Sequence, residues 1–350
     1  MRTVALIAVA SAALILAASA ATKPPHYPKV PRPPAEPAVT TPVLPEATAL
    51  PARAATIKIR GVARNNVDAT LAVTPNGIWT ASGAYRINPA DNTVSGPFVR
   101  GTEHDIGVGA GSVWVSDYNA MAVLRLDPRT GKRLASVQLN RFAAPEGVVA
   151  AGGAIWVAAH HGGNVIRIDA RTNRIAATIQ IQVPKSGGPQ EVAAGFGSVW
   201  VAVPNDQAVF RIDPRSNKVT GIVVLPRSIE PCGGIAVGKS DLWISGCSEG
   251  TKIARIDPRT NKVVAVLEVG GEVFQPAVDG NTVWFVAGGD PDYGPKNVPA
   301  YLIQLRADDT VATRIQLPNG FISGGTAVAA GSIWVADFSH PRVIRIPKSS

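Results

Sequence analysis

The residues best suited to acid–base or metal chemistry are histidines and carboxylates that stand at fixed distances from tryptophans. His104 and Glu146 each lie ten residues before a tryptophan, and His160 and His161 lie four and five residues after one. Imidazole and carboxylate groups can ligate a divalent cation such as Mg²⁺, or pair as a general base and its orienting group. We therefore predict that Glu146, His160 and His161 form a catalytic or metal-binding set. A polar, solvated rim is the alternative.

Further polar residues stand at or beside the same two positions before and after the other tryptophans. In a repeat protein, equivalent loops converge on one face, so these side chains are predicted to share one ligand-binding surface. Four of the five histidines fall on this face. Asp290 belongs to an insertion from Gly288 through Pro299, which is interpreted as a lid, a partner contact or a neutral insertion. The predicted ligand-binding residues are His104, Asp105, Tyr118, Gln190, Glu191, Gln275, Asp290 and His340.

The two cysteines allow a more specific prediction. Cys232 begins one predicted strand, Cys247 ends the next, and the turn between them is centred on Gly238 to Asp241. An antiparallel hairpin would place the two thiols opposite each other, at a separation that a disulfide can bridge. We therefore predict a Cys232–Cys247 disulfide. A free thiol nucleophile or a metal ligand is the alternative.

The elements that must position these residues belong to a repeat. The seven tryptophans are spaced by 35, 42, 44, 43, 41 and 50 residues, which is typical of propeller blades. Each unit contains four short runs of alternating Val or Ile, separated by Gly, Asp-Pro or Thr-Asn turns. The sequence thus predicts an all-β, seven-bladed β-propeller over residues 56–350. The last unit ends after its third strand, so Thr56–Arg60 is predicted to supply the missing fourth strand and close the ring.

Composition and charge exclude several classes of protein. Hydrophobic residues make up 46% of the chain, which excludes disorder for its bulk. The net charge of +9 comes largely from repeated Asp-Pro-Arg turns around the ring, and no basic–aromatic strip accompanies it. We interpret the turns as scaffold rather than as cation or phosphate sites. Nucleic acid is therefore not an expected partner; a small molecule or an exported protein is, and the protein is expected to be a monomer.

The first 55 residues differ from the rest. Arg2, an apolar run from Val4 to Ala17 and the small residues Ala18–Ala20 predict a signal peptide over residues 1–20, with an uncleaved membrane anchor as the alternative. Ten prolines then predict a polyproline-II spacer over residues 21–55, or a tail that binds a wall or a partner. The mature protein is expected to be periplasmic or secreted, without a transmembrane segment.

The blades resemble a known group of bacterial propellers. Val113–Asp117 and Ile333–Asp337, each followed by an Arg-Ile or Arg-Leu strand, are similar to YVTN/NHL-type repeats, whose superfamily includes the streptogramin (virginiamycin B) lyase-like proteins. That resemblance implies the fold. It also implies that a His/Glu set with Mg²⁺ on the loop face is one option, although no motif maps the set onto residues here. Two functions remain: an exported propeller that recognises a ligand, or a lyase or lactonase that cleaves a cyclic ester.

Overall fold

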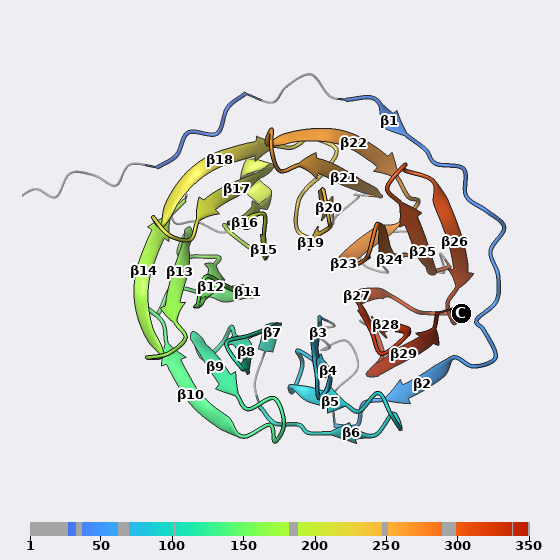
Figure 1. Cartoon of the computed structure of the whole chain (residues 1–350), viewed down its shortest axis with the longest axis horizontal. Helices are drawn as coiled ribbons and strands as arrows, with labels where there is room; N and C mark the ends of the chain where they lie inside the picture. The colour runs from blue at the N-terminus through green and yellow to red at the C-terminus, as the bar shows by residue number, and fades with distance from the viewer. Residues whose placement is uncertain are drawn as a thin grey trace, which may run out of the picture.

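Seven sheets, six of four strands and one of five, are arranged radially around a central axis (Figure 1). This computed structural model describes residues 27–32, 37–61, 70–100, 103–181, 188–246, 251–288, 299–337 and 339–348. Within each blade the first strand lies nearest the axis and the fourth lies at the rim. The architecture confirms the predicted seven-bladed propeller.

The strands follow the tryptophan repeat in chain order. Blades 1 and 2 contain β3 (Leu71–Thr74), β4 (Gly77–Thr80), β5 (Tyr85–Ile87), β6 (Val94–Ser95), β7 (Glu103–Gly109), β8 (Ser112–Asp117), β9 (Ala122–Leu126) and β10 (Arg133–Gln138). Blades 3 and 4 contain β11 (Pro145–Ala151), β12 (Ala154–Ala159), β13 (Asn164–Asp169), β14 (Arg174–Gln180), β15 (Val192–Gly195), β16 (Ser198–Val203), β17 (Ala208–Asp213) and β18 (Lys218–Val224), with a 3₁₀ turn at Pro204–Asp206.

Blades 5 to 7 complete the ring. Their strands are β19 (Gly234–Val237), β20 (Leu242–Ser245), β21 (Lys252–Asp257), β22 (Lys262–Glu268), β23 (Glu272–Asp279), β24 (Thr282–Gly288), β25 (Tyr301–Arg306), β26 (Val311–Gln316), β27 (Ser323–Ala329), β28 (Ser332–Asp337) and β29 (Arg342–Pro347). The N-terminal strands β1 (Val39–Thr40) and β2 (Ala55–Lys58) join blades 5 and 7.

Each tryptophan lies in the second strand of its blade, and all seven are buried. In four blades the indole N–H donates to the carbonyl five residues earlier, as Trp114 does to Gly109 (3.1 Å) and Trp334 to Ala329 (3.0 Å). Aliphatic side chains of the same blade and of the next one share a buried cluster with the ring, for example Val123 and Ile155 with Trp114. Tryptophan therefore fixes the inner hairpin and fills the space between blades, as expected for packing residues rather than a ligand cage.

An N-terminal strand closes the ring. β2 pairs antiparallel with β29 of blade 7 over four residue pairs, from Ala55↔Arg345 to Lys58↔Arg342. Ile57 and Ile59 are buried against the core shared by blades 7 and 1. The closing strand was predicted at Thr56–Arg60, and the observed strand begins one residue earlier and ends two residues earlier.

The described part of residues 27–54 runs along the outside of the ring, past β18, β22 and β26 (Figure 1). Val39 and Thr40 form β1, a fifth and parallel strand on the outer edge of blade 5. Thr48 bridges to blade 6, where its N–H donates to Arg314 O (2.9 Å) and its carbonyl accepts from Gln316 N (2.8 Å). The sequence predicted a spacer here, and the structure places this segment, hereafter the strap, against three blades.

The repeated Asp-Pro turns are built as the scaffold interpretation expects. Asp127, Asp169, Asp213 and Asp257 each accept, through Oδ1, the backbone N–H two residues ahead at 2.9 Å. These hydrogen bonds lower the pKa of each carboxyl group below its ordinary value. Residues 1–26, which include the predicted signal peptide, lie outside the described part of the chain. No helix within that part is long and apolar enough to cross a membrane.

Candidate functional site

β-Bulges near the start of the first strand position side chains in four blades. The pairing between first and second strands shifts register between Glu103 and Ile106, and between Pro145 and Val148. Equivalent shifts occur in blades 6 and 7, between Phe274 and Ala277 and between Ser323 and Thr326. A bulge interrupts the ladder and redirects the residues within it. Residues ten before each of these four tryptophans, which the sequence pattern singled out, all lie within or at the start of a bulge.

Glu146 and His160 form a buried pair in blade 3. Glu146 lies in the bulge of β11, and His160 follows directly after β12. The Glu146 Oε1 and His160 Nδ1 atoms are 3.5 Å apart, and the residues are 7% and 8% exposed. A carboxylate at this distance can orient the imidazole ring. The pair therefore places two groups that are able to exchange protons close to the loop face.

His161 and Tyr118 lie beside this pair and are more exposed to solvent. The Tyr118 hydroxyl group is 3.3 Å from His161 Nε2, and the two rings meet edge to face with their centroids 5.9 Å apart. The centroids of the His160 and His161 rings are 5.1 Å apart. Partial burial, together with the negative charge of Glu146, raises the pKa of the Tyr118 phenol. The structure thus brings together four predicted residues from blades 2 and 3, hereafter the Tyr–His cluster: Tyr118, Glu146, His160 and His161.

Asp105 lies next to this cluster but joins two blades. It is 9% exposed, and its Oδ2 accepts the backbone N–H of Val148, in the first strand of blade 3, at 2.8 Å. Burial raises the pKa of the Asp105 carboxyl group to about 6, against the opposing effect of N–H donors from Val148 and Ile106. The carboxyl group is thus committed to the contact between the inner strands of blades 2 and 3.

Three other predicted ligand-binding residues lie in blades 4 and 6. Gln190 accepts the N–H of Gly147 through its backbone carbonyl (2.8 Å), and Glu191 accepts the N–H of Ala202 in the same way (2.9 Å). The amide side chain of Gln275, in blade 6, accepts the N–H of Leu71 in blade 1 at 2.7 Å and donates to its carbonyl at 3.3 Å. Gln275 therefore links the inner strands of two blades that flank blade 7.

His340 belongs to a separate group of polar residues in blade 7. Its Nδ1 lies 2.7 Å from Ser339 Oγ and 3.3 Å from Oδ2 of Asp337, which is fully buried. Asp337 also accepts a hydrogen bond from Arg342 Nε (2.7 Å). The partners of His340 thus come from its own loop rather than from blades 2 and 3. Sequence reasoning passed over Asp337 and Arg342, although an aspartate ends the second strand in blades 2 and 7 alike.

The side chains of three predicted residues are not among those that the structure describes. Asp290 and Cys247 lie outside the described residues, and only the backbone of His104, in β7, is described. Cys232 is disulfide-bonded, and the hairpin of blade 5 has the register Gly234↔Ser245 that the predicted pairing requires. The partner of Cys232 stays a prediction.

The predicted metal-binding set of Glu146, His160 and His161 stays a prediction. Within the described part of the chain, no three or more His, Cys, Asp or Glu side chains are grouped so that they could hold a metal ion. The His161 Nε2 atom faces the Tyr118 hydroxyl group rather than the Glu146–His160 pair.

Comparisons with known proteins show which solved structures share the fold. No family model and no curated protein matches the sequence. A solved streptogramin B lyase is 16% identical, with a TM-score of 0.69 over 83% of this chain and 96% of its own. A catalytically inactive virginiamycin B lyase from Staphylococcus aureus, solved with quinupristin, is 18% identical, with a TM-score of 0.70 over 85% and 99% of the two chains. BamB from Moraxella catarrhalis is 12% identical, with a TM-score of 0.56 over 85% and 97%. The resemblance inferred from the repeats is confirmed for the fold.

Proposed function

We propose that this protein is an exported recognition propeller that binds a small polar molecule, or a polar segment of an exported protein, on the loop face of blades 2 and 3. The carrying observation is the Tyr–His cluster, in which two blades bring polar side chains to one place. Propeller loops converge around an axis, so a ligand there can touch several blades at once. The predicted signal peptide supports export.

The chemistry of the cluster favours a ligand with both donors and acceptors. The Tyr118 hydroxyl group and the His161 imidazole ring can each donate or accept a hydrogen bond at the surface. Beneath them, the buried Glu146–His160 pair can take up or release a proton as the ligand binds. The edge-to-face Tyr118 and His161 rings add an apolar surface for stacking.

A thermal-shift screen of polar metabolites and peptides tests this proposal. Compounds that raise the melting temperature of the natural protein are then titrated against H161A, Y118F and the control D127A, which alters a turn at the other end of blade 2. We expect each site variant to weaken binding by roughly tenfold, because one hydrogen bond is lost, and the control to bind normally. Equal binding by all four proteins would contradict the proposed site.

The second candidate is a lyase or lactonase that opens a cyclic ester. It is favoured by the Glu146–His160 pair, which is suited to proton transfer, and by the fold shared with solved streptogramin lyases. Incubation with quinupristin and with simple lactones, with and without chelator, separates the two functions when the products are resolved by chromatography. Recognition predicts that each compound is recovered unchanged. Conversion that is lost in H160A would establish the enzyme instead.

A further inference from the structure

A repeated arginine contact joins neighbouring blades at the end of the ring opposite the Tyr–His cluster. The arginine of the third strand reaches the turn between the third and fourth strands of the next blade, and in most blades it lies over the tryptophan of its own blade. Arg125 donates to Ala170 O (2.7 Å) and Asn173 Oδ1 (3.0 Å), and its Nε donates to Ser112 Oγ (2.8 Å). Arg86, Arg211, Arg255 and Arg345 make the equivalent contact with the turn of the next blade.

The junction between blades 3 and 4 lacks this contact. Arg167 lies over Trp156, with its guanidinium carbon 5.7 Å from the ring centroid, but it donates no hydrogen bond to any described residue. The Nε atom of Arg167 is buried without a hydrogen-bond partner. So is Asn217 Oδ1, which would accept from Nη1 of Arg167 if this junction matched its neighbours. Asn173 and Asn261 occupy the same place at neighbouring junctions and do accept an arginine.

The residue two before the tryptophan differs between blades. Blades 2, 4 and 7 carry Ser112, Ser198 and Ser332 there, and each serine accepts the Nε–H of the arginine in its blade. Blade 3 carries Ala154 at this position, so the Nε–H of Arg167 has no hydroxyl group to donate to. A buried donor and a buried acceptor that remain unpaired cost free energy, so this junction is less tightly held than its neighbours.

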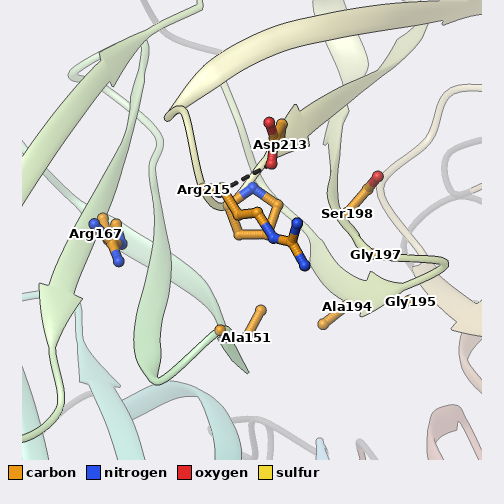
Figure 2. Close-up of a pocket in the computed structure, with 10 residues that line it drawn as sticks. Ala151, Arg167, Ala194, Gly195, Gly197, Ser198, Asp213 and Arg215 are labelled. Atoms are coloured by element: carbon orange, nitrogen blue, oxygen red, sulfur yellow. Dashed lines mark hydrogen bonds between the residues drawn. The ribbon is translucent and has the colours of Figure 1, made fainter.

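A cavity of about 810 Å³ opens at this junction. Figure 2 shows Arg167 on one side, with Asp213 and Arg215 of the blade 4 turn on the other. The volume falls within the range typical of small-molecule sites. Two cations and one carboxylate line the cavity, and hydrogen bonds from its own turn lower the pKa of Asp213 and keep it ionised. The lining therefore carries one net positive charge.

We propose that this cavity binds a small organic monocarboxylate that also carries a hydroxyl or amino donor. The planar guanidinium of Arg167 can bind both oxygens of a carboxylate. The hydroxyl or amino group of the ligand would then donate to the Asp213 carboxylate, which lines the same cavity. A dianion fits less well, because the Asp213 carboxylate faces the same space. This site is separate from the Tyr–His cluster, since it lies at the turns between first and second and between third and fourth strands.

Glycolate, a small member of this class, is the probe. Arginine Nε–H resonances of ¹⁵N-labelled protein are followed during a titration at constant ionic strength, and the Arg167 signal is identified by its absence in R167K. We expect a saturable shift of that signal in the natural protein and at least about tenfold weaker binding in R167K, measured by calorimetry. A154S supplies the missing acceptor, so it should move the Arg167 Nε–H resonance without ligand and weaken glycolate binding.

The control variant is R345K, which alters a closed junction on the far side of the ring and should bind glycolate normally. The proposal is overturned if glycolate produces no saturable shift, or if R167K binds it as well as the natural protein does. Tighter binding of inorganic phosphate than of glycolate would overturn the assignment to monocarboxylates. If A154S does not fold, R167K and the phosphate comparison still decide the question.

Discussion

His160 and His161 are adjacent in sequence but differ in burial and therefore in what their substitution should do. His160 is buried beside Glu146, whereas His161 is exposed beside Tyr118. We expect H160A to lower the free energy of unfolding by about 2 kcal/mol, because it removes a buried side chain that contacts the Glu146 carboxylate. H161A should change it by less than about 0.5 kcal/mol. Urea denaturation measures both, and equal losses would contradict the assignment of these environments.

Asp105 should make stability depend on pH. Its pKa of about 6 in the folded protein lies above the ordinary 3.8, so the folded protein binds the proton more tightly. This contribution is fully present below about pH 4 and is lost as the pH rises through about 6, a change of roughly 3 kcal/mol. D105N should remove it. Denaturation of both proteins across this range gives the difference, and parallel profiles would show that Asp105 does not titrate in this way.

Residue spacing singled out the residues that lie in the bulges of the first strands, but it predicted neither the bulges nor the direction of every side chain in them. Counting back from each tryptophan works because the tryptophan fixes the inner hairpin, so equivalent residues reach equivalent places. It could not show that the Gln275 amide turns to the backbone of Leu71, or that His340 is held by Asp337. Those outcomes depend on contacts between distant parts of the chain, which spacing within one blade does not contain.

At the scale of elements, the inter-blade arginines should differ in their contribution to stability. Arg345 donates to Ser332 Oγ (3.0 Å) and, in blade 1, to Pro89 O (2.6 Å), and it lies over Trp334. R345A should therefore cost about 2 kcal/mol, since hydrogen bonds from a charged donor are lost. R167A should cost much less, because Arg167 makes no such bond to a described residue. Thermal denaturation of the two variants compares them, and equal losses would contradict an open junction between blades 3 and 4.

The blades themselves could be predicted because their strands and turns have strong local preferences. Alternating Val and Ile favour half-buried strands, and the Asp-Pro turns form their own hydrogen bonds. The open junction has no comparable local signal. Ala154 replaces the serine in blade 3, but Gly77 and Asp241 replace it in blades 1 and 5, where the arginines still reach the next blade. The open junction is visible only in the hydrogen bonds of the structure.

For the whole molecule, closure of the ring and the strap should contribute separately. Removal of residues 21–50 deletes β1 and the Thr48 bridges to Arg314 and Gln316. We expect it to cost roughly 3 kcal/mol, or about 5–10 °C in melting temperature. Removal of residues 21–60 also deletes β2 and the buried Ile57, so the ring should stay open. We then expect no cooperative unfolding transition of the kind that the closed ring shows. Calorimetry distinguishes these outcomes, and equal melting temperatures for the two truncations would refute closure by β2.

The sequence of the strap could not predict its path along the outer strands of blades 4, 5 and 6. Proline-rich chains adopt extended structure whether they are free or bound to a surface. β1 has only two residues, and its pairing with β22 depends on the outer edge of blade 5 lying within reach. Ring closure, in contrast, followed from counting strands, because a blade with three strands leaves an edge to be filled.

Histidine NMR tests recognition at the Tyr–His cluster most directly. The chain has five histidines, so the ring Cε1–H signals of His26, His104, His160, His161 and His340 can be assigned by single substitution. Each compound selected by the thermal-shift screen is titrated into the natural protein. The proposed function predicts saturable shifts of the His160 and His161 signals, with those of His26 and His340 unchanged. Binding that leaves the His160 and His161 signals unmoved, or that shifts the His340 signal alone, would contradict it.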